Sequence, residues 1–234
     1  MFRRLKAKLI AAWTEQEKTL SQKSGETSPE AALESEAVPS DSTNGGSVAD
    51  TRTSGNAQKV NEIKEIYFAG GCFWGVEKYF SFIQGVTETC VGYANGRTID
   101  PSYEDVHGGG TGHAETVKVT YDTSIVSLET LLSMFFDIID PTSVNRQGAD
   151  EGDQYRTGIY YSDPDDEGTI RGALRLLQAF YTSPIAVEAT PLKWFFIAEA
   201  FHQNYLTKNP SGYCHISDDL FMKARSSSRG KNGG

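Results

Sequence analysis

A break in composition near residue 62 limits which part of this chain of 234 residues can fold. Residues 20–60 consist almost entirely of Ser, Thr, Gly, Ala and charged residues, with no aromatic residue and only scattered Leu and Val. Such a segment buries too little apolar surface to offset the entropy that is lost on ordering. We therefore expect residues 1–62 to be a disordered extension and linker, residues 63–222 to form the folded domain, and residues 223–234 to be a disordered tail.

The net charge of −9 belongs to the folded part of the chain, because basic and acidic side chains balance within residues 1–60. An acidic domain repels phosphate groups, which argues against a nucleic acid as partner. The sequence has no apolar stretch of about 18 residues, so we expect no transmembrane segment.

The first 13 residues, MFRRLKAKLIAAW, are basic and contain no acidic residue. If they are helical, Phe2, Leu5, Leu9 and Trp13 share one face, which is typical of an organelle-targeting or membrane-surface helix. The apolar run is too short for a secretory signal. The alternative is a start segment without a function of its own.

The three cysteines, Cys72, Cys90 and Cys214, are odd in number and far apart in the chain. This pattern argues against a structural disulfide framework and indicates a reducing compartment, so we expect a cytoplasmic protein. No Cys-x-x-Cys or His-x-x-x-His spacing occurs, and the adjacent Cys214 and His215 are poorly placed to bind one ion. We therefore expect no metal site.

Hydrophobic periodicity in the folded part predicts strands that alternate with helices. The expected strands cover residues 64–71, 86–93, 115–122, 155–162 and 184–189, the expected helices cover residues 72–85, 127–140, 163–181 and 193–206, and long coils are expected at 94–113 and 208–217. In the third helix, Asp163 is the expected cap. This order predicts an α/β fold: an α+β two-layer sandwich with helices against a mixed sheet, and a ferredoxin-like core plus long coils.

Cys72 lies in the sequence FAGGCFWG, where the first predicted strand gives way to a helix. The dipole and free N–H groups at a helix start favour a thiolate, which predicts a Cys72 pKa below the ordinary value of about 8.5. Gly70 and Gly71 leave room for a substrate atom. Phe73 and Trp74 provide an apolar wall that suits a small apolar group. The alternative is a structural cysteine packed by two core aromatics.

The segment PSYEDVHGGGTGHAET, residues 101–116, combines a glycine-rich loop with His113 and Glu115. No Gly-Lys-Ser/Thr follows the glycines, which argues against a nucleotide site. Glu115 directly precedes an alternating strand. If it points into a cleft, desolvation would raise its pKa and keep it protonated as a proton donor. The alternative is an exposed carboxylate at a strand end.

Other candidates lie on loops farther along the chain. Tyr103 and Tyr155 offer hydroxyl donors to a polar oxygen, although half-buried tyrosines more often serve packing. Asp150 shares the loop at 148–156 with Tyr155. Cys214 lies in a Pro/Gly coil from which a thiol can reach a distant reactive sulfur. An incidental exposed cysteine is the other interpretation.

Taken together, these motifs resemble one family. The matching segments are GCFWG at 71–75, GYANG at 92–96, PSYEDV at 101–106, TGHAETV at 111–117, QYR at 154–156, HQNYL at 202–206 and NPSGYC at 209–214. Their order is similar to that of the peptide-methionine (S)-S-oxide reductases, methionine sulfoxide reductase A, over about residues 64–220. Enzymes of this kind reverse methionine sulfoxide formation.

The resemblance implies a role for each candidate. Cys72 would be the nucleophile, Glu115 the proton donor and Cys214 the resolving cysteine. Substrate-binding residues would be Phe73 and Trp74 around the S-methyl group, Tyr103 and Tyr155 at the sulfoxide oxygen, and Asp150 in the substrate loop. The chain departs from the family pattern at the glycines 108–110, at Ala149 and at Asp153, and Cys90 has no family role.

The implied reaction is reduction of methionine S-sulfoxide, in proteins and as the free amino acid, as repair of oxidative damage. It would proceed through a sulfenic acid on Cys72 and a disulfide with Cys214, and thioredoxin, an external dithiol, would regenerate the enzyme. No cofactor on the protein is expected. Two other hypotheses remain: an acyl-transfer enzyme with Cys72 as nucleophile and His113 as base, and a non-catalytic protein that binds methionine-containing peptides.

Overall fold

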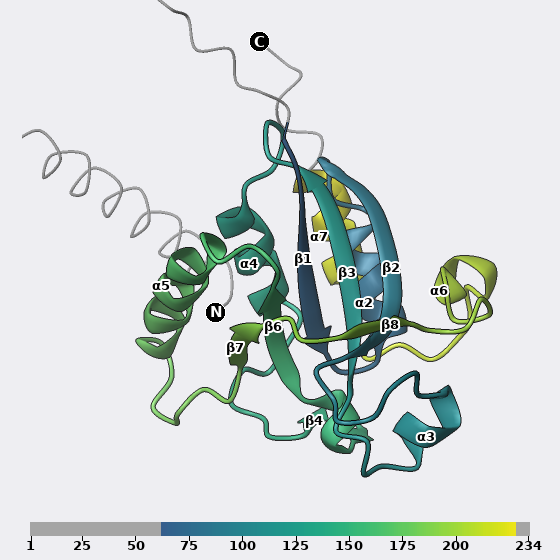
Figure 1. The fold of residues 1–234 in the computed structure, drawn as a ribbon. Helices are drawn as coiled ribbons and strands as arrows, with labels where there is room; N and C mark the ends of the chain where they lie inside the picture. The colour runs from purple at the N-terminus through teal and green to yellow at the C-terminus, as the bar shows by residue number, and fades with distance from the viewer. Residues whose placement is uncertain (1–61, 228–234) are drawn as a thin grey trace, which may run out of the picture.

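The structure is a computed structural model that describes residues 62–227 (Figure 1). The predictions for residues 1–61, including the basic segment 1–13, and for residues 228–234 lie outside this part. Within it, no helix is both long enough and apolar enough to cross a membrane.

Six strands form one mixed sheet in the order β7-β6-β1-β3-β2-β8. They are β1 (Ile63–Gly70), β2 (Val86–Ala94), β3 (Ala114–Asp122), β6 (Thr157–Tyr161), β7 (Glu188–Pro191) and β8 (Phe195–Ile197). Neighbouring strands are antiparallel except β6 and β7, which are parallel. A separate hairpin pairs β4 (Arg146–Gln147) with β5 (Asp150–Glu151).

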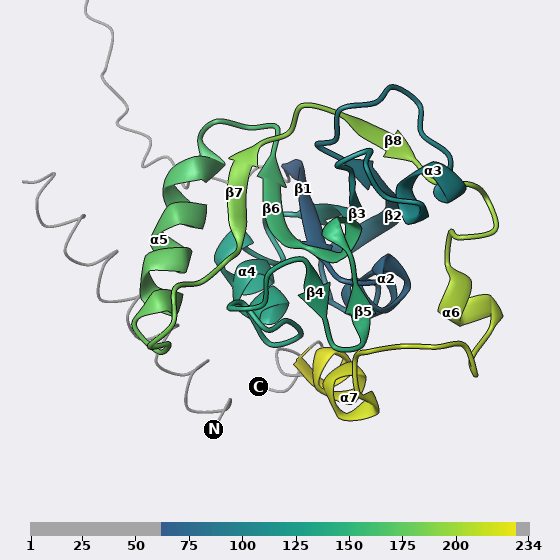
Figure 2. The same cartoon turned by 90° about the horizontal axis from the view of Figure 1, so that it is seen from below.

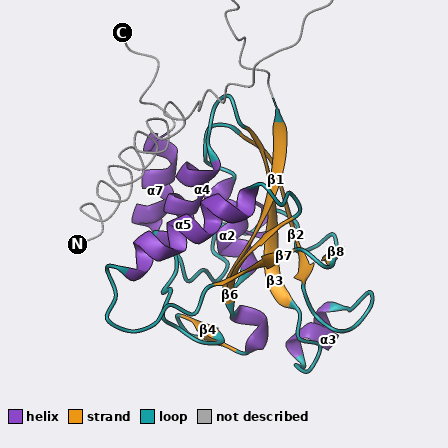
Figure 3. Cartoon of the chain, turned by 60° about the vertical axis from the view of Figure 1, so that its left-hand side comes forward, coloured by secondary structure: helices purple, strands orange, loops and turns teal. Residues whose placement is uncertain are grey.

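The longer helices gather on one side of the sheet (Figure 3). They are α2 (Phe73–Phe80), α4 (Leu128–Phe136), α5 (Asp166–Gln178) and α7 (Asp218–Ser227). The shorter ones are α3 (Tyr103–His107), the 3-10 turn η1 (Asp153–Tyr155) and α6 (Tyr205–Lys208). The chain order β1-α2-β2-β3-α4-β6, with β6-β1-β3-β2 side by side, is the ferredoxin-like arrangement. The predicted two-layer α/β sandwich with a mixed sheet is confirmed.

Successive side chains of β1 point to opposite faces of the sheet. On the helix side, the ring of Phe68 stacks on Phe80 of α2, with centroids 4.6 Å apart, and on Phe135 of α4, at 4.7 Å. On the other side, Tyr67 meets Phe195 edge to face at 5.2 Å. The segment that carries β8 therefore covers the face that the helices leave open (Figure 1).

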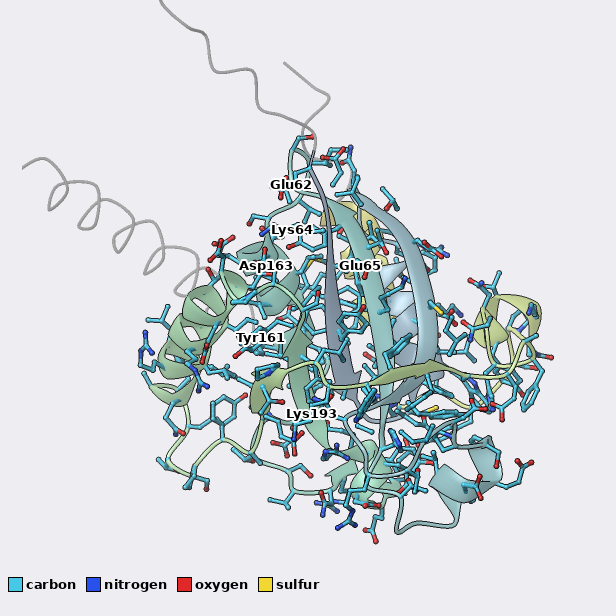
Figure 4. All side chains as sticks on the ribbon, in the orientation of Figure 1. Glu62, Lys64, Glu65, Tyr161, Asp163 and Lys193 are labelled. Atoms are coloured by element: carbon cyan, nitrogen blue, oxygen red, sulfur yellow. The ribbon has the colours of Figure 1, made fainter. Side chains whose placement is uncertain are left out.

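An ion pair joins β1 to the start of α5. Lys64 Nζ lies 2.6 Å from Asp163 Oδ2 and 3.3 Å from Asp166 Oδ1 (Figure 4). Asp163 is not the helix cap that the sequence predicts, because Asp165 occupies that position. The Asp163 carboxylate instead accepts the backbone N–H of Asp165 at 3.0 Å, so the helix begins a few residues later than predicted.

The predicted helix at residues 193–206 is wrong. This segment forms the short edge strand β8, then a coil and the single turn α6. The reason is non-local: β2 offers an open edge, and Phe196 pairs with Tyr93 on it. Gly92 leaves the space that this pairing needs, since a Cβ there would collide with the Phe196 carbonyl oxygen. The strand predicted at 184–189 lies instead at Glu188–Pro191.

Two helices replace expected coil or tail. In the loop at 94–113, Ser102 caps α3 through a capping box with Asp105, in which each side chain binds the other residue's backbone N–H. At the C-terminus, α7 continues through Ser227, past residue 223, where the sequence predicts the start of the tail. Lys223 Nζ binds Asp137 Oδ2 at 2.7 Å and ties this helix to the end of α4.

Candidate active site

Cys72 occupies the N-cap of α2, directly after the turn that ends β1. The turn needs glycine at position 71, where φ is +84° and a Cβ would lie 2.6 Å from Gln147 Cβ in the hairpin (Figure 2). Cys72 is buried, with 8 % of its surface exposed. The backbone N–H of Trp74 faces the Cys72 sulfur and favours its ionised form.

Glu115 lies at the same helix start. It extends from β3, is 3 % exposed, and its Oε2 accepts the backbone N–H of Phe73 at 3.0 Å. Burial raises its pKa to about 8, although the Phe73 N–H opposes this shift. Glu115 is therefore mostly protonated at neutral pH. The interpretation of Glu115 as an exposed carboxylate at a strand end is wrong.

The predicted lowering of the Cys72 pKa is also wrong. Burial raises this pKa well above its ordinary value, and the negative charges of Glu115 and Asp150 raise it further, whereas the Trp74 N–H lowers it. A helix end contributes only about 0.3–1 kcal/mol, less than the cost of an anion in a dry site. Protonation of Glu115 removes the nearest repulsion, so the neutral acid and the thiolate favour each other.

Trp74 lies in the first turn of α2, two residues after Cys72. Its ring stacks on Tyr205 of α6 with centroids 3.8 Å apart, and its indole N–H donates to His202 Nδ1 at 3.0 Å. Phe73 is almost fully buried and faces the ring of His202 at 5.1 Å. The coil before α6 therefore holds the aromatic side chains next to the thiol.

Tyr103 and Tyr155 both lie within electrostatic reach of the two reactive groups. Burial raises the pKa of each phenol, and the charges of Glu115 and Cys72 raise it further, so both hydroxyls stay protonated and can donate. The ring of Tyr103 lies 4.6 Å from that of His202. The structure therefore brings both predicted tyrosines to the site.

Two carboxylates that were not predicted from the sequence, Glu199 and Glu77, bind the backbone of the segments that carry Tyr103 and His202. Glu199 accepts the backbone N–H of Tyr103 and the hydroxyl of Tyr93, each at 2.8 Å. Glu77 of α2 accepts the backbone N–H of Asn204 at 2.8 Å, where φ is +55°. Burial raises the Glu77 pKa to about 7. The sequence signal for Glu77 is a carboxylate on the apolar face of a helix.

His202 was missed as well. It is buried at the centre of the aromatic cluster, and its Nε2 lies 3.9 Å from Glu199 Oε2 without a hydrogen bond. Burial lowers its pKa, so the ring is neutral and Nδ1 is free to accept from Trp74. The sequence signal that could have identified His202 is its place in the motif HQNYL, which matches the family.

Asp150 and Cys214 reach the site from distant parts of the domain sequence. Burial raises the Asp150 pKa, whereas His215 and the Tyr213 hydroxyl lower it. The Cys214 sulfur lies 2.9 Å from the place that a Cβ of Gly75 would take, and Gly75 is in the first turn of α2. Cys214 therefore lies over the helix that begins at Cys72, and both thiols are free.

His113 does not belong to the site. It is fully buried, its Nδ1 accepts the backbone N–H of Gly96 at 3.1 Å, and its Nε2 therefore donates to the carbonyl of Thr98 at 2.9 Å. Both ring nitrogens are occupied by the turn, so His113 cannot act as the base of an acyl-transfer enzyme. Cys90 lies in β2, paired in register with Lys118.

Within residues 62–227, no three His, Cys, Asp or Glu side chains form a group that could hold a metal ion. The groups gathered around the start of α2 are a thiol, a protonated carboxyl, two phenols and a second thiol.

Comparison with known proteins identifies the family of this chain. The model of the family "Peptide methionine sulfoxide reductase" matches residues 64–232. The peptide methionine sulfoxide reductase MsrA of Lachnoclostridium phytofermentans is 57 % identical over 162 residues, which are 69 % of this chain and 98 % of the relative. That of Clostridium botulinum strain Okra is 57 % identical over 157 residues, or 67 % of this chain and 100 % of the relative.

Two solved structures are also similar. Reduced Mxr1 from Saccharomyces cerevisiae has a TM-score of 0.63 at 36 % identity, over 68 % of this chain and 96 % of that chain. Methionine sulfoxide reductase A of Corynebacterium diphtheriae has a TM-score of 0.62 at 37 % identity, over 65 % and 77 %. The chain belongs to the peptide methionine sulfoxide reductase family and is an oxidoreductase that reduces methionine sulfoxide to methionine.

Proposed function

We propose that this chain reduces the S epimer of methionine sulfoxide, in proteins and as the free amino acid, with Cys72 as nucleophile and Glu115 as proton donor. One observation carries the proposal: a buried carboxyl with a pKa of about 8 shares the N-terminus of α2 with a buried thiol. Two successive backbone N–H groups point at these side chains. That of Phe73 donates to Glu115, and that of Trp74 faces Cys72.

The first step needs both groups at once. A sulfoxide sulfur becomes electrophilic only when the charge on its oxygen is neutralised, so the thiolate requires an acid beside it. Cys72 attacks the sulfoxide and Glu115 supplies a proton to the oxygen. The substrate sulfur is reduced to the thioether, Cys72 takes the oxygen as a sulfenic acid, and methionine leaves. The two-electron change balances between the two sulfurs.

The surrounding residues orient the substrate. Tyr103 and Tyr155 are assigned to the sulfoxide oxygen, because both are neutral hydroxyl donors near Glu115 and Cys72. Phe73 and Trp74 are assigned to the S-methyl group. Asp150 is assigned to the rest of the substrate from its place at the rim, where it is only partly buried.

The second half of the cycle uses Cys214 as the resolving cysteine. Its sulfur condenses with the sulfenic acid on Cys72, forming a disulfide and water. An external dithiol of the thioredoxin type then returns both thiols by exchange. These steps take all their electrons from thiols, so no metal, flavin or nucleotide is assigned to the protein. Three cysteines without a disulfide framework suit a reducing compartment, and we assign the protein to the cytoplasm.

An assay with the two resolved sulfoxide epimers tests this function. We expect the enzyme to convert only the S epimer, because Tyr103, Tyr155 and the wall at Trp74 bind the oxygen and the methyl group at fixed positions. Mass spectrometry after the reaction without reductant should show a loss of two hydrogens and a Cys72–Cys214 link. Conversion of both epimers, or an acyl adduct on Cys72 after treatment with esters, would contradict the proposal.

The Cys214→Ser variant tests the resolving role. We expect it to form one methionine per enzyme and then stop when thioredoxin is the reductant, because a hydroxyl at this position cannot form the disulfide that thioredoxin reduces. Product per enzyme in the first turnover and in the steady state is the measurement. Cys90→Ser is the matched control and should turn over normally. Sustained turnover of Cys214→Ser with thioredoxin would remove Cys214 from this role.

A further inference from the structure

His215 follows Cys214 directly, and the reaction described above gives it no role. Its side chain is 6 % exposed, and its Nδ1 lies 3.8 Å from Asp150 Oδ2. Neither ring nitrogen makes a well-formed hydrogen bond to the described residues, and Asp150 Oδ2 also has no partner there. Buried polar atoms are costly to leave unpaired, so three of them in one place indicate an interaction that forms during the cycle.

The ring of His215 packs on the turn that precedes Cys72. Its Cε1 lies 3.3 Å from the place of a Cβ at Gly71, and its own Cβ lies 3.5 Å from that of Gly148 in the hairpin. The sulfur of Cys214 contacts the position of Gly75 on the other side. Two consecutive side chains therefore lie on either side of Cys72: His215 contacts Gly71, just before Cys72 in the chain, and Cys214 contacts Gly75, three residues after it.

We propose that His215 is the positioning residue of the resolving step. By hydrogen bonding to Asp150, it holds the segment 213–215 against the turn at Gly71 and so keeps the Cys214 sulfur beside Cys72. The inference rests on the proposed function, because it requires Cys214 to be the resolving cysteine. In this step the sulfurs of Cys214 and Cys72 form a bond, the S–O bond of the sulfenic acid breaks, and the hydroxyl leaves as water with the Cys214 proton.

The charges around His215 allow this pairing. Burial lowers the His215 pKa, and this effect outweighs the Asp150 carboxylate and the Gly70 backbone, which both raise it. The neutral ring still donates from Nδ1 when the proton is on that nitrogen. The Tyr213 hydroxyl also lowers the Asp150 pKa, although burial raises it.

Two replacements of His215 separate positioning from packing. His215→Asn keeps a donor on Cγ, where Nδ1 is attached in histidine, whereas His215→Leu keeps apolar bulk and loses the donor. In a rapid-quench single turnover, methionine is quantified by chromatography, the sulfenic acid is trapped with dimedone, and the Cys72–Cys214 disulfide is mapped by mass spectrometry. Thermal unfolding of each variant checks that it is folded.

We expect the wild type and both variants to form the first methionine at the same rate. Disulfide formation should be slower in His215→Leu by about 10–100-fold, the cost of a misplaced reacting group, with trapped sulfenic acid accumulating. His215→Asn should restore most of the rate. In an Asp150→Leu background, which lacks the acceptor, His215→Leu should cause no further slowing. The control Asp218→Asn, which removes another carboxylate that acts on Cys214, should leave the disulfide step unchanged.

Several results would overturn the inference. These are wild-type disulfide rates in His215→Leu, a faster disulfide step in His215→Leu than in His215→Asn, equal slowing of methionine formation, or equal slowing in Asp218→Asn. Failure of the proposed function looks different: Cys214→Ser would then still form a disulfide or turn over with thioredoxin, whatever the His215 variants do.

Discussion

The Cys72→Ser variant is expected to form no methionine from methionine sulfoxide, even with excess dithiothreitol. A serine hydroxyl in this buried position is neither ionised nor able to take the oxygen and return it through a disulfide, so the reaction loses its electron donor. Release of methionine, measured by chromatography over many enzyme equivalents, is the readout. Binding of a methionine sulfoxide peptide should persist, since the walls at Trp74, Tyr103 and Tyr205 are intact.

The matched control for this variant is Cys90→Ser, which removes a half-buried thiol in β2 and should keep normal turnover. Two outcomes would contradict the role of Cys72. Turnover of Cys72→Ser would transfer the chemistry to another thiol. Equal loss in Cys90→Ser would point to a general effect of thiol removal. The alternative hypothesis, a non-catalytic protein that binds methionine-containing peptides, predicts no turnover even for the wild type.

The Glu115→Gln variant is expected to lose about 10²–10⁴-fold in kcat, the usual contribution of a positioned proton donor. Glutamine retains the shape and can still accept the Phe73 N–H, so the loss reflects the missing proton. Cys72 gains thiolate as pH rises, because its pKa lies well above the ordinary value, whereas Glu115 loses its proton above about pH 8. The wild-type rate should therefore rise with pH up to about 8 and then level off, and the variant should lack this levelling.

Steady-state rates between about pH 6 and pH 10, at saturating sulfoxide, bracket the raised Glu115 pKa and measure both effects. Glu88→Gln, an exposed carboxylate on β2, is the control and should keep the wild-type rate and profile. An unchanged rate in Glu115→Gln would remove this residue from the acid role. A levelling near pH 8 that persists in Glu115→Gln would assign the titration to a different group.

The parts of the fold that follow from local pattern were predictable. Strand β3 alternates apolar and polar residues, β1 is a short apolar run that ends in glycines, and α2 follows this glycine turn. The junction that holds Cys72 could therefore be located from residues 68–75 alone. The helix predicted at residues 193–206 was wrong because the aromatic residues of this segment are compatible with either a helix or an edge strand. Only the open edge of β2, about a hundred residues earlier, decides between them.

The reactive groups of the site could be predicted from the sequence, but the residues that hold them in place through hydrogen bonds could not. Cys72 and Glu115 carry recognisable chemistry, whereas Glu77, Glu199 and His202 act through hydrogen bonds to residues about 100 or more positions away. The direction of the Cys72 pKa shift also depends on burial, which the sequence does not state. The helix start was identified correctly, but its effect is smaller than that of desolvation.

The glycines beneath residues 213–215 have a consequence for the speed of the cycle. Gly71 and Gly75 present bare backbone to His215 and Cys214, so these two side chains lie close against the glycine turn and the first turn of α2. Neither residue belongs to a strand or a helix, so lifting this strip of coil breaks no strand pairing, and its main cost is exposure of the His215 side chain, which is 6 % exposed in place. The second thiol can therefore alternate between an inward site and an outward-facing reductant without melting the sheet or the helices around it.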